Sequence, residues 1–372
     1  MIDRKRFTSL LVSLPVLTTT TRAARAAGAA DPYKIGVVWP LTGPLAASGI
    51  QYLPGASVAV RHINRAGGIN GHPLQLVVED SQGTPQGGVT SMRKVVQVDG
   101  VQALLAIYTN VVTAMIPLAD QLKIPFLCPA QTPNLMNKGQ YSFAHAETIP
   151  ATAALFRDYW RKQKVKRLYA LIPGNAIGPV YSAAFKAGAA AAGADYAESS
   201  FNYGESDYRG LVARVKEYNP DTVMVAAQGG IDDTVIIKQL REAAVNAPLN
   251  VPGLFYDEPA WRAGVGTYIN GLVMAGVKID PVAGKQFLDD YRIDTGHPAP
   301  AIAAEVYDMV KMLAAAIAKG TYTGESIRNQ LATLKGVPSV LGGTITMDPD
   351  HYSAPATDAL WQVQNDKLVK VS

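Results

Sequence analysis

The chain has 372 residues, 48% of them hydrophobic, with Gly and Pro scattered along it, so we expect two or three folded domains rather than a disordered chain. Its formal net charge is +4, but residues 1–30 hold five of the 34 basic and one of the 30 acidic side chains, which leaves 29 of each sign in the remainder. A balanced remainder removes the main support for nucleic-acid binding, which needs concentrated Lys and Arg.

The N-terminus has the pattern of an export signal. Arg4-Lys5-Arg6 is basic, 10–17 is an apolar run too short to span a membrane, and 23–30 contains small-x-small cleavage sites. We therefore expect 1–30 to be a signal peptide, cleaved between Ala26 and Asp31, and the mature protein to be periplasmic. The alternative is a frayed helical arm of a cytosolic protein. The basic start is an imperfect twin-arginine motif, so the general secretory and twin-arginine routes both stay open.

Beyond the signal, short apolar runs alternate with helical periodicity. Continuous Val, Ile and Leu content without strict alternation is typical of strands covered on both faces. The predicted strands are 34–39, 74–79, 103–107, 125–128, 168–172, 222–226, 253–256 and 271–276. The predicted helices between them are 55–66, 87–98, 113–121, 151–163, 180–192, 208–217 and 234–244.

Two such series meet near residue 147, which predicts an α/β protein with two doubly wound, Rossmann-like lobes. A long helix (301–319), a shorter one (324–334) and two strand-like pieces (343–347 and 359–364) follow and are expected to complete both lobes. The predicted N-terminal lobe is therefore 31–146 with 277–347, and the predicted C-terminal lobe is 147–276 with 348–372.

Ligands of doubly wound sheets bind outside the carboxyl ends of the strands. The segments to inspect are therefore 40–49, 108–112, 129–133, 173–178, 227–231 and 257–261.

Four segments in this order and spacing carry a family pattern. They read VVWPLTGPLAASG (37–49), INRAGGINGHPLQLVVED (63–80), PFLCPAQTPNL (125–135) and YRGLVARVKEYNPDTVMV (208–225). Together they resemble the leucine/isoleucine/valine-binding family of periplasmic proteins that serve ABC transporters. The resemblance implies a type I periplasmic binding protein fold with a three-crossing hinge. It also implies a monomer without cofactor or catalytic activity that passes a small carboxylate ligand to a membrane permease.

The resemblance also implies a ligand site on the first lobe. The ligand's carboxylate is expected at two loops, Tyr108-Thr109-Asn110 and Ala130-Gln131-Thr132. The family usually has a serine at Asn110. For Asn110 and Thr132 the alternative role is helix capping, which Asn and Thr do well.

From the second lobe, Tyr256-Asp257-Glu258 falls where the family places the acid that holds an ammonium group. Asp257 aligns best, and Glu258 matches after a one-residue slip. Ile177 and Gln228 are expected to line the side-chain pocket.

Two departures from the family concern this pocket. Ser48 stands at the family's aromatic position, and Trp39 replaces a small residue nearby. The changed position of the aromatic residue indicates a reshaped pocket. The sequence favours an apolar or aromatic amino acid as the ligand, and aromatic acids and keto acids stay open as alternative ligands.

The sequence carries no recognisable motif for catalysis or metal binding. The five His residues show no HExxH spacing, Cys128 is the single cysteine, and no phosphate loop or nucleophile elbow is present. We therefore expect no enzyme, no cofactor and no metal site. A transport binding protein is the leading interpretation, ahead of a sensory receptor of the same fold and of an exported α/β enzyme.

Overall fold

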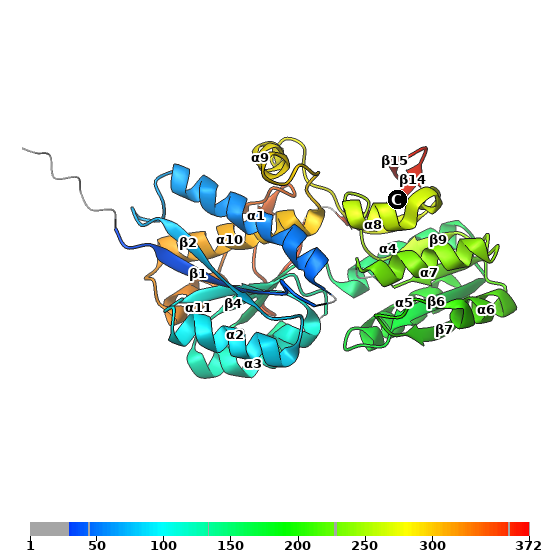
Figure 1. Cartoon of the computed structure of the whole chain (residues 1–372), viewed down its shortest axis with the longest axis horizontal. Coiled ribbons are helices and arrows are strands. Elements are labelled where there is room, and N and C mark those ends of the chain that lie inside the picture. Colours follow the sequence, from blue (N-terminus) through cyan, green and yellow to red (C-terminus); the bar gives the residue numbers. More distant parts are fainter. Residues whose placement is uncertain (1–29, 44, 133, 227–228, 356–357, 372) are drawn as a thin grey trace, which may run out of the picture.

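The computed structural model describes residues 30–43, 45–132, 134–226, 229–355 and 358–371. The predicted signal peptide lies almost wholly outside these residues. The described chain forms two α/β lobes that lie side by side (Figure 1). In this part of the chain, no helix has the length and apolar character needed to cross a membrane.

The first lobe is built on a six-stranded sheet whose strands all run parallel. Its inner strands are buried, as expected for strands covered on both faces, whereas the edge strand 74–80 is only partly buried. Across the sheet they are β13 (Tyr352–Ser353), β5 (Ser142–His145), β4 (Phe126–Cys128), β3 (Ala103–Ala106), β1 (Tyr33–Trp39) and β2 (Leu74–Asp80). The helices of this lobe are α1 (Ala46–Arg65), α2 (Pro85–Gln97), α3 (Thr109–Leu122), α9 (Lys285–Thr295), α10 (Ala301–Lys319) and α11 (Gly324–Ala332), with a 3₁₀ turn η1 (Met136–Lys138).

The second lobe is built on a seven-stranded sheet. Across the sheet its strands are β15 (Lys367–Lys370), β14 (Asp358–Gln364), β10 (Val273–Val277), β9 (Leu249–Val251), β8 (Thr222–Val225), β6 (Arg167–Pro173) and β7 (Asp195–Phe201). The last two strands of the chain, β14 and β15, are antiparallel additions at one edge. The helices are α4 (Ile149–Lys162), α5 (Gly178–Ala192), α6 (Arg209–Tyr218), α7 (Ile231–Glu242) and α8 (Pro259–Val265), followed by the 3₁₀ turn η2 (Gly266–Ile269).

Three segments connect the lobes: one after β5, one after β10 and one between β13 and β14. The expected division at residue 347 is too early, because Tyr352–Ser353 still pairs with β5 in the first sheet. The predicted strand 343–347 also differs. Thr344–Ile345 (β12) pairs only with β11 (Val337–Pro338), in a small hairpin outside both main sheets.

Element boundaries differ most at the ligand-facing edges. Helix α1 begins nine residues before the expected 55–66, and α3 begins four residues before the expected 113–121. The predicted strand 253–256 is a turn, because Pro252 and Gly253 end β9 and lead the chain into α8. These shifts bring residues expected in loops into first helical turns.

The hinge contains a buried polar cluster. His145 Nδ1, at the end of β5, lies 3.0 Å from Ser353 Oγ of β13, and burial lowers the pKa of His145 to about 4. Asp308 of α10 accepts hydrogen bonds from Ser339 Oγ and from the amide of Val340. His145 is therefore a buried, hydrogen-bonded residue of the hinge.

Candidate ligand-binding site

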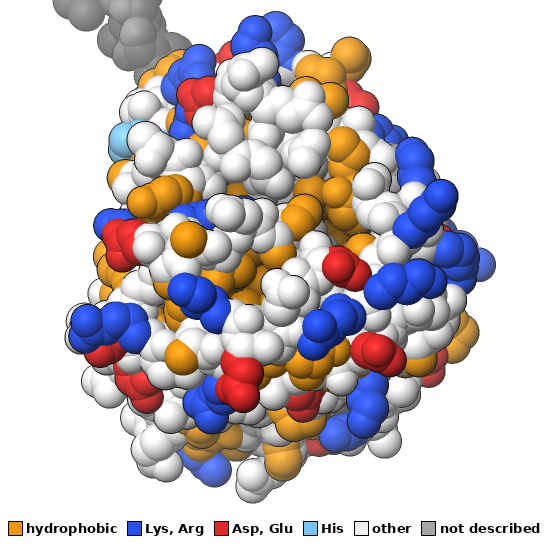
Figure 2. All heavy atoms as spheres, turned by 90° about the vertical axis from the view of Figure 1, so that its right-hand side faces the viewer, with side chains coloured by type: hydrophobic (Ala, Val, Ile, Leu, Met, Phe, Trp, Pro, Cys, Tyr) orange, Lys and Arg blue, Asp and Glu red, His pale blue; other side chains and the backbone are white. Residues whose placement is uncertain are grey.

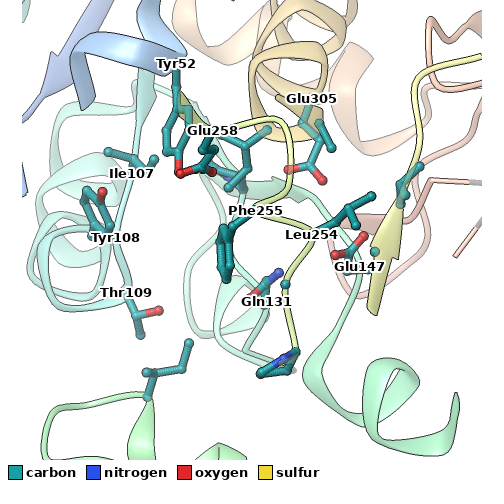
Figure 3. A pocket seen from close by; sticks show the side chains of 18 of the residues that line it. Tyr52, Ile107, Tyr108, Thr109, Gln131, Glu147, Leu254, Phe255, Glu258 and Glu305 are labelled. Atoms are coloured by element: carbon teal, nitrogen blue, oxygen red, sulfur yellow. Dashed lines mark hydrogen bonds between the residues drawn. The ribbon is translucent and has the colours of Figure 1, made fainter. Parts of the chain in front are cut away.

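A cavity lies between the two lobes, at the carboxyl ends of the strands (Figure 3). Its empty volume, which includes space open to solvent, is about 850 Å³. The first lobe and the hinge line it with Tyr52, Ile107, Tyr108, Thr109, Pro129, Gln131, Glu147, Ala301, Ile302 and Glu305. The second lobe lines it with Ile177, Tyr181, Pro252, Gly253, Leu254, Phe255, Glu258, Gly276 and Val277.

On the first lobe, the N-terminus of α3 reaches the cavity. Tyr108 is the N-cap residue and has φ of 70°, a strained value for a residue other than Gly, and Thr109 begins the helix. The helix has no acidic side chain in its first turn. The first amides of a helix and its dipole favour an anion. This end of the cavity therefore suits the carboxylate of a ligand.

On the second lobe, Glu258 provides a buried acid. It is the N-cap residue of α8, and 4% of its surface is exposed. Tyr52 of α1 donates a hydrogen bond of 2.9 Å from its hydroxyl to Glu258 Oε1. Burial raises the pKa of Glu258 to about 8, with nearby Asp233 and Asp257 adding to the rise and the Tyr52 hydrogen bond opposing it.

Asp257, the residue that aligned best with the family's acid, lies elsewhere. It does not line the cavity but lines an adjoining pocket, with Lys278, Leu288 and Pro298. Tyr256 also points away from the cavity, because its hydroxyl donates to the carbonyl of Asp366 and Arg262 stacks on its ring. Of these two neighbouring acids, Glu258 is the one that lines the cavity.

Several expected residues of the first lobe do not face the cavity. Trp39 is fully buried in the core, and its indole donates to the carbonyl of Gly49 at 2.8 Å. Ala130 is part of the core beside α3. Asn110 donates to the carbonyl of Gly83 at 3.0 Å and lines a neighbouring pocket. Thr132 lies at a groove beside α4 and α5.

The remaining expectations divide into two groups. Tyr108, Thr109, Gln131 and Ile177 line the cavity together with Glu258. Gln228 and the side chain of Ser48 lie outside the described residues.

Sequence reasoning missed Tyr52. It follows Ser48 by four residues in α1, and residues four apart lie on the same helix face. This chain has Ser48 at the position where the family has an aromatic residue, and its own aromatic residue, Tyr52, lies one helical turn later. The length of α1 was the missing information, since the expected helix began only at residue 55.

Phe255 was also missed, because its segment was read as a strand. Its ring forms one wall of the cavity and packs against Trp261, with ring centroids 5.6 Å apart. A side chain at Gly253 would not fit beside it, since a Cβ there would lie 2.2 Å from the ring. Gly253 therefore provides the space in which the Phe255 ring lies.

Two further glutamates line the cavity. Glu147 follows β5 at the first crossing and Glu305 lies on α10, with 9% and 4% of their surfaces exposed. The sequence signal for Glu305 was its position as a single acid within the apolar run AIAAEVY. Among the described residues, no group of three or more His, Cys, Asp or Glu is arranged to hold a metal ion.

Most of this chain matches a known protein family. Residues 32–367 match the family model described as periplasmic binding protein. Leu/Ile/Val-binding protein homolog 3 of Brucella melitensis is 28% identical over 96% of this chain and 99% of its own length. Leu/Ile/Val-binding protein BraC3 of Rhizobium johnstonii is 29% identical over 83% of this chain and 85% of its own.

Solved structures share the fold. The branched-chain amino acid transporter substrate-binding protein LivJ of Streptococcus pneumoniae, in complex with isoleucine, superimposes with a TM-score of 0.82 at 22% identity and covers 91% of this chain and 100% of its own. A solute-binding protein of an ABC transporter from R. palustris, in complex with benzoate, has a TM-score of 0.81 at 18% identity and covers 92% of this chain and 96% of its own. The same fold thus holds an amino acid in one neighbour and an amine-free acid in the other.

Proposed function

This chain belongs to the periplasmic binding protein family, and on that basis we propose that it binds an α-amino acid between its lobes and delivers it to the permease of an ABC transporter. Its relatives include proteins named for leucine, isoleucine and valine binding. The structural neighbours with isoleucine and with benzoate are described as the substrate-binding protein of a branched-chain amino acid transporter and as a solute-binding protein of an ABC transporter.

The position of Glu258 carries the proposal. It faces a cavity whose other lobe presents the N-terminus of α3 at Tyr108 and Thr109. An α-amino acid has one group for each end: a carboxylate for the helix amides and an ammonium for the glutamate. An amine-free acid leaves a buried carboxylate without a cationic partner, which is unfavourable unless that carboxylate is protonated.

The same arrangement supports closure of the lobes around the ligand. Thr109 and Glu258 come from different lobes, so a ligand that contacts both connects them. A ligand that binds the folded protein stabilises it by RT ln(1 + [L]/Kd), about 2.7 kcal/mol at a hundredfold excess over Kd. Small-angle scattering should show a smaller radius of gyration with saturating ligand.

A second candidate is an aromatic acid without an amine. The raised pKa of Glu258, about 8, favours the protonated acid near neutral pH, and a protonated carboxyl donates a hydrogen bond to a ligand carboxylate. Phe255 and Tyr181 supply aromatic surface in the cavity. This candidate differs from the first in one point, the absence of the ammonium group.

The deciding experiment is calorimetric titration with matched pairs: leucine against 4-methylpentanoate, and phenylalanine against 3-phenylpropanoate. The wild type should bind the amino acid of a pair more tightly, and Glu258→Gln should weaken it by roughly 2–5 kcal/mol, since one partner of a buried charge pair is lost. Glu217→Gln, which changes an exposed acid of α6 that does not line the cavity, should bind as the wild type does. Binding of only the amine-free acids would rule the amino-acid proposal out.

Export and delivery need tests of their own. N-terminal sequencing of periplasmic material should give a chain that starts between Ala26 and Asp31. A strain without the protein should lose uptake of the ligand and regain it with the wild type, but not with Glu258→Gln. A cytoplasmic product that keeps Arg4–Arg6 would contradict export.

A further inference from the structure

Tyr203 has a buried hydroxyl group without a hydrogen-bond partner among the described residues. The residue follows β7 on the second lobe, and its ring packs against Phe201 with ring centroids 5.3 Å apart. A buried tyrosine hydroxyl usually has a partner, because an unpaired polar group in the interior costs free energy. The unpaired hydroxyl of Tyr203 is therefore a candidate contact for a ligand.

Tyr203 lines a pocket to which both lobes contribute. Three residues of this pocket, Tyr108, Thr109 and Ile177, also line the ligand cavity, so the two spaces adjoin. None of the described residues that line the pocket is Asp, Glu, Lys or Arg. A ligand group that reaches from the cavity towards Tyr203 therefore meets hydrogen-bonding and apolar groups, and no charged side chain among the described lining residues.

The first lobe contributes the N-terminus of α3 to the same pocket. Thr109 and Asn110 begin this helix, and no side chain caps it. The side chain of Asn110 donates instead to the carbonyl of Gly83, at 3.0 Å. The first amides of α3 are thus donors that a ligand can use, and the hydroxyl of Tyr203 is a donor from the other lobe.

The hydroxyl of Tyr203 keeps its proton throughout the physiological pH range. Burial raises the pKa of Tyr203 well above its usual value, and the nearby Asp233 adds to the rise. Asp233 and its neighbour Asp232 accept hydrogen bonds from the amides of Gly230 and Gly204, within the second lobe. A protonated hydroxyl and uncapped helix amides all donate, which favours an anionic group between them.

We propose that the hydroxyl of Tyr203 donates a hydrogen bond to the carboxylate of the ligand, which the N-terminus of α3 holds from the other lobe. The second lobe then contacts the ligand at two places, with Glu258 at the ammonium and Tyr203 at the carboxylate. The carboxylate by itself thus connects the two lobes. The inference rests on the proposed function, since it concerns the same cavity and the same ligand carboxylate.

Calorimetric titration of Tyr203→Phe tests this contact, because the variant keeps the ring and removes only the hydroxyl. The probes are leucine with 4-methylpentanoate and phenylalanine with 3-phenylpropanoate, in which the carboxylate is the only hydrogen-bond acceptor. Tyr203→Phe should weaken each probe that the wild type binds by the same factor, roughly ten- to a hundredfold, as for a hydrogen bond to a charged group. Tyr268→Phe, in η2, lines neither the cavity nor the pocket and is the matched control, so it should change no affinity.

The stability of the ligand-free variant separates a ligand contact from a structural role. Because the hydroxyl of Tyr203 has no partner in the described chain, its removal should not lower the free energy of unfolding measured in urea. Weaker binding with unchanged stability supports the contact. A loss of stability as large as the loss of binding free energy would instead make Tyr203 a structural residue and overturn the inference.

The outcomes separate this inference from the proposed function. If Glu258→Gln weakens the amino acids while Tyr203→Phe binds every probe as the wild type does, the carboxylate contact is wrong and the proposed function stands. If the wild type binds only the amine-free acids and Tyr203→Phe weakens them, the proposed function fails and the carboxylate contact stands. If the wild type binds none of the four probes, both fail.

Discussion

The hydroxyl of Tyr52 on the first lobe donates a 2.9 Å hydrogen bond to Oε1 of Glu258 on the second lobe, and both side chains are buried. This bond joins α1 to the turn before α8 across the cavity. It also holds the acid at the place where a ligand ammonium is proposed to bind. The stability of the ligand-free protein and its affinity for the ligand should therefore both depend on Tyr52 and Glu258.

Tyr52→Phe removes the donor and keeps the ring. The free energy of unfolding should fall by about 1–3 kcal/mol, because a buried carboxyl loses its partner. The pKa of Glu258 should rise further, since the hydrogen bond from Tyr52 lowers it. Urea unfolding measures the first effect. An unchanged unfolding free energy would mean that the bond contributes nothing in solution.

Binding of an amine-containing ligand should depend on pH. An ammonium binds the ionised form of Glu258, and this acid has a pKa of about 8 without ligand. The affinity should therefore rise with pH up to about 8, approaching tenfold per pH unit well below that value, and binding should release a proton. Titrations from pH 6 to 8.5 in buffers of different ionisation enthalpy measure both effects. In Glu258→Gln the dependence should be lost, whereas a flat profile in the wild type would contradict the assignment.

Glu258 should also make stability depend on pH. Its pKa is raised in the folded protein, from 4.5 to about 8, so the folded state holds the proton more tightly than the unfolded state. Its stabilising contribution is fully present below pH 4.5 and is lost as the pH rises towards 8. Glu258→Gln should match the wild type near pH 4.5 and exceed it by up to a few kcal/mol near pH 8. Urea unfolding at both pH values tests this, and an equal difference at both would refute it.

Gly253→Ala should weaken ligand binding by moving the wall of the cavity. The added Cβ would lie 2.2 Å from the Phe255 ring, so the ring has to move from its position. Gly210→Ala is the control, since nothing lies within 4 Å of a Cβ there, and it should stabilise α6 by about 0.5–1 kcal/mol. Calorimetric titration and thermal unfolding of both variants give the comparison. Full affinity in Gly253→Ala would mean that Phe255 does not define the site.

The surface agrees with the balanced charge of the chain beyond residue 30. On the face of the second lobe shown in Figure 2, Lys and Arg side chains are interspersed with Asp and Glu. The acidic character of the cavity is therefore a local property that the overall charge does not reveal.

The sequence by itself determined the class of fold and the edge of the sheets at which to look. Continuous apolar runs predicted strands buried on both faces, and the carboxyl ends of those strands led to the segments 108–112 and 129–133. Within them the family resemblance indicated Tyr108, Thr109 and Gln131, which line the cavity. These inferences succeeded because they depend on local pattern and on the direction of parallel strands.

Only the tertiary structure decided which side chains face the ligand. Asp257 and Glu258 are neighbours in sequence, yet after the turn before α8 Asp257 lines an adjoining pocket and Glu258 lines the cavity. Tyr52, Glu147 and Glu305 come from a helix, a crossing segment and a second helix that are distant in sequence. Their convergence depends on how the two lobes pack, and side-chain direction in a turn depends on backbone dihedrals that residue type alone does not specify.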